Sequence, residues 1–92
     1  MNPQEFEAGL RADHYGEIAT VSKPVGYSMG EHIHPFDACA LITEGAISIT
    51  VAGVPRSYGV GDIFRLAAGT PHLEDAAAHG VTYLVGRRQQ SQ

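Results

Sequence analysis

Three histidines are spaced so that they could bind one metal ion. His32 and His34 lie two positions apart, and His72 lies much further along the chain. Side chains at i and i+2 of a β-strand point to the same face, so the first two imidazoles would lie together. A third imidazole from a distant strand would complete a facial site for a divalent transition metal such as Fe, Mn, Ni or Zn. The alternative is that all three are ordinary polar residues at strand ends.

Short strands separated by Gly and Pro must position these histidines. Ile47 and Ile49 alternate with Ser48 and Thr50, which is the pattern of a strand with one buried face. Strands of this length and spacing are typical of an all-β sandwich or barrel. We predict strands at residues 17–23, 27–34, 38–43, 46–51, 56–58, 62–66, 70–74 and 81–86.

The segment before these strands predicts one short α-helix, at about residues 3–13. Asn2 suits the N-cap and Pro3 suits the first helical position. Phe6 and Leu10 are four positions apart and form an apolar stripe. Because so short a helix is marginal alone, we expect it to pack on the outside of the barrel.

Length and charge limit the classes of protein to which this chain can belong. With 92 residues, we expect one domain over residues 1–92, with a barrel at about 17–87 and a frayed tail at 88–92. The six Lys and Arg residues form no basic cluster, so we expect no nucleic-acid partner. No apolar run approaches the roughly 20 residues that span a bilayer, so we expect no membrane partner. The lack of a signal peptide and the single cysteine predict a cytoplasmic location.

Two stretches, taken together, resemble the two motifs of the cupin family. Residues 26–45 are similar to cupin motif 1, written G-x5-H-x-H-x3,4-E-x6-G, and residues 61–72 are similar to motif 2, written G-x5-P-x-G-x2-H-x3-N. The resemblance covers about residues 17–87. It implies a double-stranded β-helix, or jelly-roll barrel, with a metal inside. The motif histidines that it implies as ligands fall on His32, His34 and His72.

The chain departs from motif 1 at the acidic ligand of the family. That position falls on Ala38 or, with the longer spacing, on Cys39. Asp37 is one residue early, and alternation would put it on the opposite face of a regular strand. A bulge after Pro35 would turn it inward, so Asp37 is our candidate fourth metal ligand. The alternative is a solvated carboxylate at the start of a strand.

Glu74 is a candidate catalytic residue. It follows His72 by two positions and therefore shares its face. We assign it to proton transfer, as a general base. It could instead complete the metal shell, orient a ligating imidazole, or be an exposed carboxylate beside Asp75.

A small pocket is expected beside the metal. The side chains at positions 38 and 40 are small, and pockets for small molecules are mostly apolar with a few polar groups. The alternative is that the side chains simply fill the barrel. The predicted lining residues are Ser28 (with Tyr27 as the alternative), Phe36, Ala38, Ala40, Ile49, Phe64, Leu66 and Tyr83.

Two functions remain open on the sequence. The first is a metal-dependent enzyme that acts on a small organic molecule, of the dioxygenase, isomerase or decarboxylase type that the cupin resemblance implies. The second is a non-enzymatic module that binds or senses a small ligand, which the missing motif 1 carboxylate favours. Met29, Ile33 and Leu41 are out of phase with the pocket, so we expect an apolar outer face and a homodimer.

Overall fold

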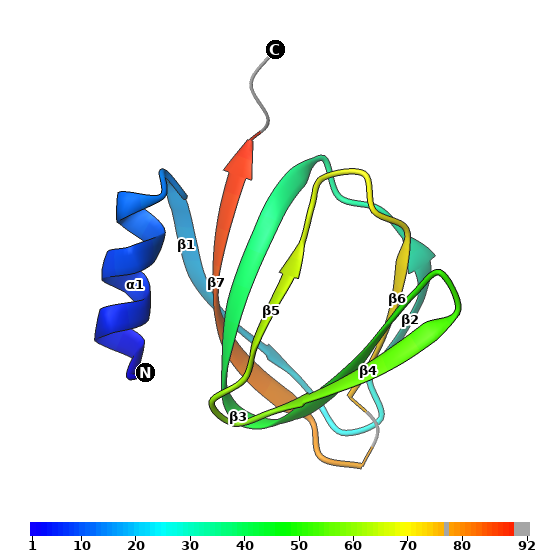
Figure 1. The fold of residues 1–92 in the computed structure, drawn as a ribbon. Helices are drawn as coiled ribbons and strands as arrows, with labels where there is room; N and C mark the ends of the chain where they lie inside the picture. The colour runs from blue at the N-terminus through cyan, green and yellow to red at the C-terminus, as the bar shows by residue number, and fades with distance from the viewer. Residues whose placement is uncertain (77, 90–92) are drawn as a thin grey trace.

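The computed structural model describes residues 1–76 and 78–89, which form a β-barrel with one helix outside it (Figure 1). The helix is α1 (Pro3–Ala12). The strands are β1 (Glu17–Lys23), β2 (Ser28–His32), β3 (Phe36–Val51), β4 (Val54–Gly59), β5 (Ile63–Leu66), β6 (His72–Asp75) and β7 (Val81–Gln89). All the strand pairs are antiparallel. The predicted all-β fold class, with a jelly-roll barrel and an external N-terminal helix, is confirmed.

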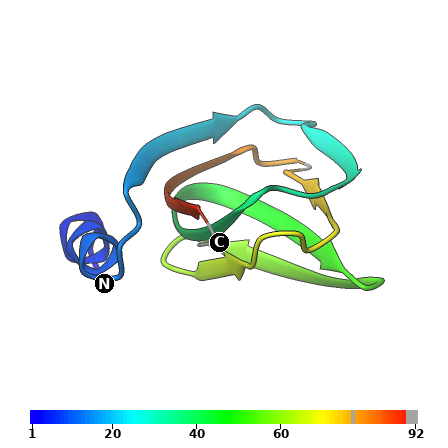
Figure 2. The same cartoon turned by 90° about the horizontal axis from the view of Figure 1, so that it is seen from above.

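The long strand β3 belongs to two sheets and joins them. Its first half pairs with β7 and β5, and β1 extends that sheet beyond β7. Its second half pairs with β4 and β6, and β2 extends that sheet beyond β6. Figure 2 shows the sheets curving around a common interior, with α1 beside them. The side chains that face this interior form the main hydrophobic core.

The sequence predicted a break in this strand that the structure does not contain. Residues 38–43 and 46–51 lie in one strand, although Gly45 separates them. Gly45 adopts φ 71°, and the next amide, that of Ala46, donates to the Gly80 carbonyl at 3.0 Å. A register shift against β7 lies just before this point. The glycine therefore bends the strand from one sheet into the other without ending it.

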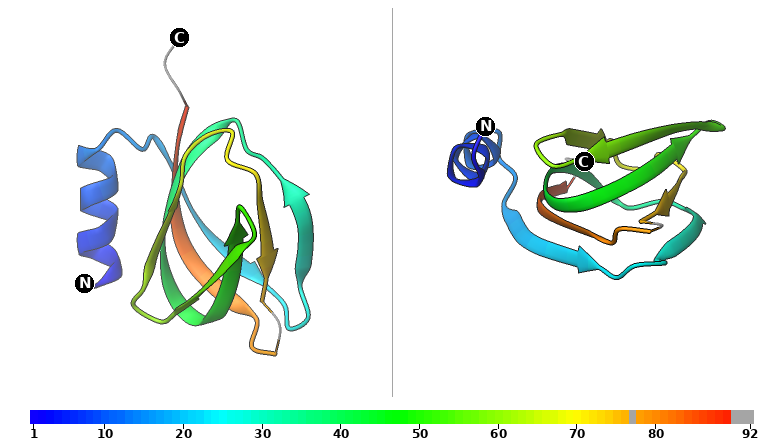
Figure 3. Two further views of the ribbon diagram at one scale, coloured as in Figure 1. Left: turned by 45° about the vertical axis from the view of Figure 1, so that its right-hand side comes forward. Right: turned by 90° about the horizontal axis from the view of Figure 1, so that it is seen from below.

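Helix α1 covers the outer face of the first sheet, as Figure 3 shows from two sides. The Asn2 side chain accepts a hydrogen bond from the Glu5 amide at 2.8 Å, which caps the helix. Phe6 and Leu10 are buried at 4% and 3% exposure, against the outward-facing side chain of Leu41. Burying each of these large side chains contributes about 1.5–3 kcal/mol, so packing rather than intrinsic propensity holds the helix.

The predicted apolar outer face does not exist as one patch. Leu41 is only 2% exposed because α1 covers it, and Met29 lines the cavity beside the histidines, although it is 43% exposed. Ile33 is 60% exposed. The homodimer stays a prediction, and it cannot rest on Leu41.

The C-terminal end of the barrel extends further than predicted. The tail at 88–92 was expected to be frayed, but β7 continues to Gln89. Arg88 donates to the Asp37 carboxylate and to the Asp13 carbonyl, so it ties β7 to β3 and to the end of α1. Residues 90–92 of the predicted tail lie outside the described residues.

In the described part of the chain, no helix has both the length and the apolar character that crossing a bilayer requires. The cytoplasmic location inferred from the sequence stays a prediction.

The close approach at Gly45 can be tested with a pair of glycine substitutions. Gly45 and Gly53 both have positive φ, which costs an alanine about 1–2 kcal/mol. A Cβ on Gly45 would also overlap the Gly80 carbonyl, whereas one on Gly53 has nothing within 4 Å. We expect Gly45→Ala to lower the free energy of unfolding in urea by at least about 1 kcal/mol more than Gly53→Ala does. Equal losses would contradict this close contact.

Candidate metal centre

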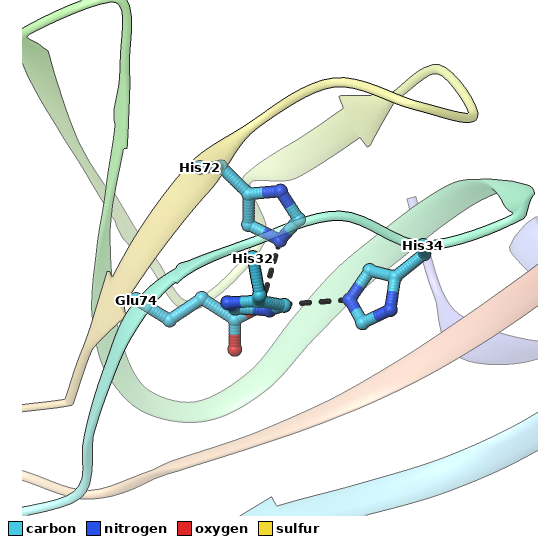
Figure 4. A group of neighbouring side chains, drawn as sticks. All are labelled: His32, His34, His72 and Glu74. Atoms are coloured by element: carbon cyan, nitrogen blue, oxygen red, sulfur yellow. Dashed lines mark hydrogen bonds and ion pairs between the residues drawn. The ribbon is translucent and has the colours of Figure 1, made fainter.

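Four side chains converge inside the barrel (Figure 4). His32 ends β2, His34 lies in the link from β2 to β3, and His72 and Glu74 lie on β6. Each offers one ligand atom, and these four atoms all lie within 4.8 Å of one another. The structure therefore brings together the three histidines that the sequence singled out, and it adds Glu74.

A bulge in β2 makes this meeting possible. Met29 pairs with Glu74, but His32 pairs with His72, so the register shifts by one residue between the two pairs. Without the extra residue, Glu31 would stand opposite His72. The bulge also reverses the alternation upstream of it, because a shift of one residue moves side chains to the other face. Met29 consequently faces the interior.

One carboxylate oxygen faces all three imidazoles. The Oε2 atom of Glu74 lies 3.0 Å from Nε2 of His72 and 3.2 Å from Nε2 of His32. The Nε2 atom of His34 is 4.0 Å away from it. The ring centroids of the three histidines are separated by 4.3, 4.9 and 5.1 Å. The Nε2 atoms thus point to a common centre.

Backbone carbonyls orient two of the rings. Nδ1 of His32 lies 2.7 Å from the Gly30 carbonyl, and Nδ1 of His72 lies 2.8 Å from the Thr70 carbonyl. A carbonyl only accepts, so each Nδ1 donates and carries a proton. In the neutral ring, Nε2 is then left with a lone pair that faces the centre. Metal-binding histidines are commonly oriented by such a partner on their other nitrogen.

His34 is held by its backbone and by ring stacking. Its carbonyl accepts from the Gly69 amide at 2.9 Å, and its ring stacks on Phe36 with centroids 4.9 Å apart. Burial lowers the pKa of His34 below its usual 6.5, and the charges of His32 and His72 lower it further. His34 is therefore neutral at pH 7, which is the form that binds metals.

Tyr27 fixes the other oxygen of Glu74. Its hydroxyl donates to Oε1 at 3.2 Å. Burial and the nearby Glu74 charge raise the pKa of Tyr27 to about 12, so the phenol keeps its proton and remains a donor. Tyr27 thus fixes Glu74 through Oε1, while Oε2 faces the histidines.

The donor set fits a divalent transition metal. The Nε2 lone pairs of His32 and His72 and the Glu74 carboxylate oxygen present negative potential to one point, which Nε2 of His34 also faces, and a cation there would relieve their repulsion. Nitrogen and oxygen donors of this kind suit Fe, Mn, Ni and Zn, so the set does not select one of these metals. His72, at 1% exposure, could not be placed so deeply without partners for both of its ring nitrogens.

Asp37 is not part of this group, which corrects the prediction that it is the fourth ligand. Its carboxylate accepts from the Ala68 amide at 2.9 Å and from Arg88 at 3.2 and 3.3 Å. The pairing of β3 with β7 is regular from Phe36 to Ala38, so the bulge expected after Pro35 is absent. Asp37 stays on the outer face because side chains alternate along a regular strand.

Asp37 still supports the centre from outside. Its bond to Ala68 holds the segment between β5 and β6, where Gly69 also contacts the His34 backbone. This segment leads directly into His72. Asp37 therefore helps to position two of the histidines without touching them.

A cavity of about 170 Å³ opens beside the centre. Hollows of about 490 and 420 Å³ beside β4 are larger, but neither contains the histidines, so we assign the chemistry to the smaller one. Of the predicted lining residues, the cavity has five: Phe36, Ala38, Phe64, Leu66 and Tyr83. Burial, and to a lesser degree the Glu74 charge, raises the pKa of Tyr83 to about 12, so it too stays a neutral phenol.

Three predicted lining residues lie elsewhere. Ser28 is exposed, since the β2 bulge turns it outward, and Tyr27 lines the cavity in its place. Ala40 and Ile49 are sealed in the hydrophobic core at 0% and 3% exposure. They face the interior as predicted, but they are packed away from this cavity.

Two cations that were not predicted from the sequence, Lys23 and Arg87, also line the cavity. Arg87 pairs with Ala38, so it faces the interior, but it lies one residue beyond the predicted last strand at 81–86. The signal was present in the sequence. Arg87 is in phase with Val85 and Tyr83, and both of these are buried in the core.

The fold and the site together define a class of protein, a jelly-roll barrel with a histidine and carboxylate centre inside. The family model for the Cupin domain matches residues 19–82. The chain belongs to the cupin family. Among curated proteins, none matches this chain.

Solved structures share the fold. A conserved protein of unknown function from Streptococcus pyogenes is 27% identical, with a TM-score of 0.69 over 82% of this chain and 65% of its own. The DMSP lyase DddQ from Ruegeria pomeroyi is 26% identical, with a TM-score of 0.71 over 82% of this chain and 39% of its own. KdgF from Halomonas sp. is 20% identical, with a TM-score of 0.68 over 80% and 69%. The chain therefore spans less than two thirds of the first and second of these proteins.

A pair of carboxylate substitutions tests which acid belongs to the centre. We expect Glu74→Gln to weaken binding of Zn²⁺ or Mn²⁺ by roughly 10–100-fold or more, because it removes a charged donor from the centre. Asp37→Asn should keep the metal stoichiometry and lower stability instead, since it weakens the contact with Arg88. Equilibrium dialysis and urea unfolding measure the two effects. Loss of metal from Asp37→Asn alone would reverse the assignment.

Proposed function

We propose that this cupin is a metal-dependent enzyme that acts on a small organic molecule. The observation that carries the proposal is the convergence of three imidazole nitrogens and one carboxylate oxygen beside a cavity. A metal that accepts six donors would keep positions open beyond these four. An open position is typical of catalytic rather than structural metal sites.

The residues of the chain would have separate tasks in such a reaction. His32, His34, His72 and Glu74 would hold the metal, which when bound supplies Lewis acidity to a substrate oxygen. Glu74 would act as a ligand through Oε2 rather than as the general base predicted from the sequence. Tyr27 would hold the Glu74 carboxylate through Oε1. The apolar wall would limit access of water to the reacting atoms.

The reaction type falls among the dioxygenase, isomerase and decarboxylase types, and the metal narrows the choice. Fe would favour oxygenation, whereas Zn, Mn or Ni would favour isomerisation or decarboxylation. A solved lyase, DddQ, has this fold at 26% identity, which supports an enzyme. The alternative is a sensor module, for which the main argument was the missing carboxylate at position 38. Glu74 supplies a carboxylate from another strand and removes that argument.

Metal content is the first test. Protein purified without a metal-affinity tag should contain about one equivalent of a divalent transition metal by elemental analysis. His72→Ala should lose it, since the deepest of the donors is gone. His79→Ala is the matched control, because this histidine lies exposed in a turn outside the centre. Less than about 0.1 equivalent after growth with added metals, or full retention in His72→Ala, would contradict the metal centre.

Turnover separates the enzyme from the sensor. Protein loaded with Fe, Mn, Ni or Zn is incubated with a panel of small organic acids, and product formation is followed by NMR. We expect turnover with at least one metal, and its loss in His72→Ala. Tight binding without turnover in every metal form would favour the sensor module.

A further inference from the structure

Two cations, Lys23 and Arg87, face the interior of the barrel and line the cavity. Arg87 pairs across the sheet with Ala38 on one side and with Glu17 on the other, so it stands on the inner face. Lys23 pairs with Val81 at the other end of β1, on the same face. Charged residues are rare on the inner face of a barrel, so two cations at this position are unusual.

Arg87 is linked to the metal centre through stacked rings. Its guanidinium carbon lies 5.4 Å from the centroid of the Phe36 ring. On this same ring stacks the imidazole of His34, with centroids 4.9 Å apart and planes at 16°. One aromatic ring therefore separates the arginine from a ligand of the proposed metal.

Among the described residues that line the cavity, two are cations and one, Glu74, is an acid, while Glu17 pairs with Arg87 from outside the lining. Glu74 lines the cavity with Lys23 and Arg87, but its oxygens face Tyr27 and the three histidines. The Lys23 ammonium lies 4.8 Å from the centroid of the Tyr27 ring. A site that combines two cations with an apolar wall suits an anionic ligand.

The partner that Arg87 has at present is easily exchanged. Its Nη1 lies 2.8 Å from the Glu17 carboxylate, and the two side chains are 30% and 60% exposed. Such an exposed pair contributes only about 0–1 kcal/mol. A carboxylate that binds both guanidinium nitrogens would form the stronger contact. Glu17 would therefore compete with a carboxylate ligand for Arg87.

We propose that Arg87, assisted by Lys23, binds the carboxylate of a small substrate whose other end reaches the metal centre. Phe36 lies between the two ends and would contact the body of the molecule. The cavity of about 170 Å³ is smaller than the roughly 300 Å³ at which drug-sized sites begin, so the substrate is a compact organic acid. This inference names the substrate class of the proposed enzyme and rests on that proposal.

Paired acids and amides test this assignment. Calorimetric titration of the metal-loaded protein compares glycolate with glycolamide, and pyruvate with pyruvamide, which differ in charge but little in shape. We expect each acid to bind at least about tenfold more tightly than its amide, because the amide cannot form a charged pair with Arg87. Arg87→Gln should remove about this tenfold from the acids and leave the amides unchanged.

Two further variants exclude a merely structural role. Arg11→Gln is the matched control, because Arg11 also forms a 2.8 Å exposed pair with a glutamate but lies on α1 away from the cavity. It should leave acid binding unchanged. Glu17→Gln removes the competitor and should strengthen acid binding, whereas loss of a structural ion pair would weaken it or leave it unchanged. This variant and the acid–amide comparison keep the test decisive if Arg87→Gln does not fold.

The outcomes separate this inference from the proposed function. Equal binding of acids and amides, or weaker acid binding in Glu17→Gln, overturns the role of Arg87 even when the metal is present. Metal stoichiometry is measured on the same samples by elemental analysis, and it decides the metal centre alone. If Arg87→Gln keeps the wild-type metal content but loses acid binding, the result supports both the metal centre and the role of Arg87.

Discussion

The bulge in β2 is the constraint on which the candidate metal centre depends. Every second side chain of a strand points into the barrel interior. A regular β2 would place Glu31 opposite His72. The extra residue between Met29 and His32 places an imidazole there instead. It also turns Met29 inward. Register is therefore what converts a short H-x-H spacing into convergent ligands, because one residue of slip moves every side chain to the other face.

Electrostatics distinguish the resulting cluster from a packed core and fit it for a cation. The Gly30 and Thr70 carbonyls accept hydrogen bonds from Nδ1 of His32 and His72. The Nε2 lone pairs of these rings therefore face a carboxylate oxygen. Acceptors that face one another at hydrogen-bond distance are costly without a proton or a cation between them. The fold holds them there through backbone contacts and β-ladders.

The carboxylates of Glu74 and Asp37 lie on opposite sides of the barrel wall and have different roles. Glu74 lies on the inner face of β6, and Asp37 lies on the outer face of β3, where Arg88 and the Ala68 amide engage it. The outer carboxylate fixes the segment that leads to His72, and the inner one faces the imidazoles. Arg87 and Arg88 divide in the same way, because neighbours in a strand point to opposite faces. Charge type alone could not assign any of these roles.

The β-barrel, the outer helix and the three histidines could be predicted from the sequence, because Gly and Pro spacing, period-two alternation and the cupin motifs are local signals. It also contained the alternation that places Arg87 with Val85. Three features become visible only in the folded chain: Gly45 bends one strand instead of dividing two, α1 covers Leu41, and Glu74 rather than Asp37 joins the histidines. Each of these depends on pairing with a distant strand or helix, and a bulge becomes visible only when both strands of the pair are in place.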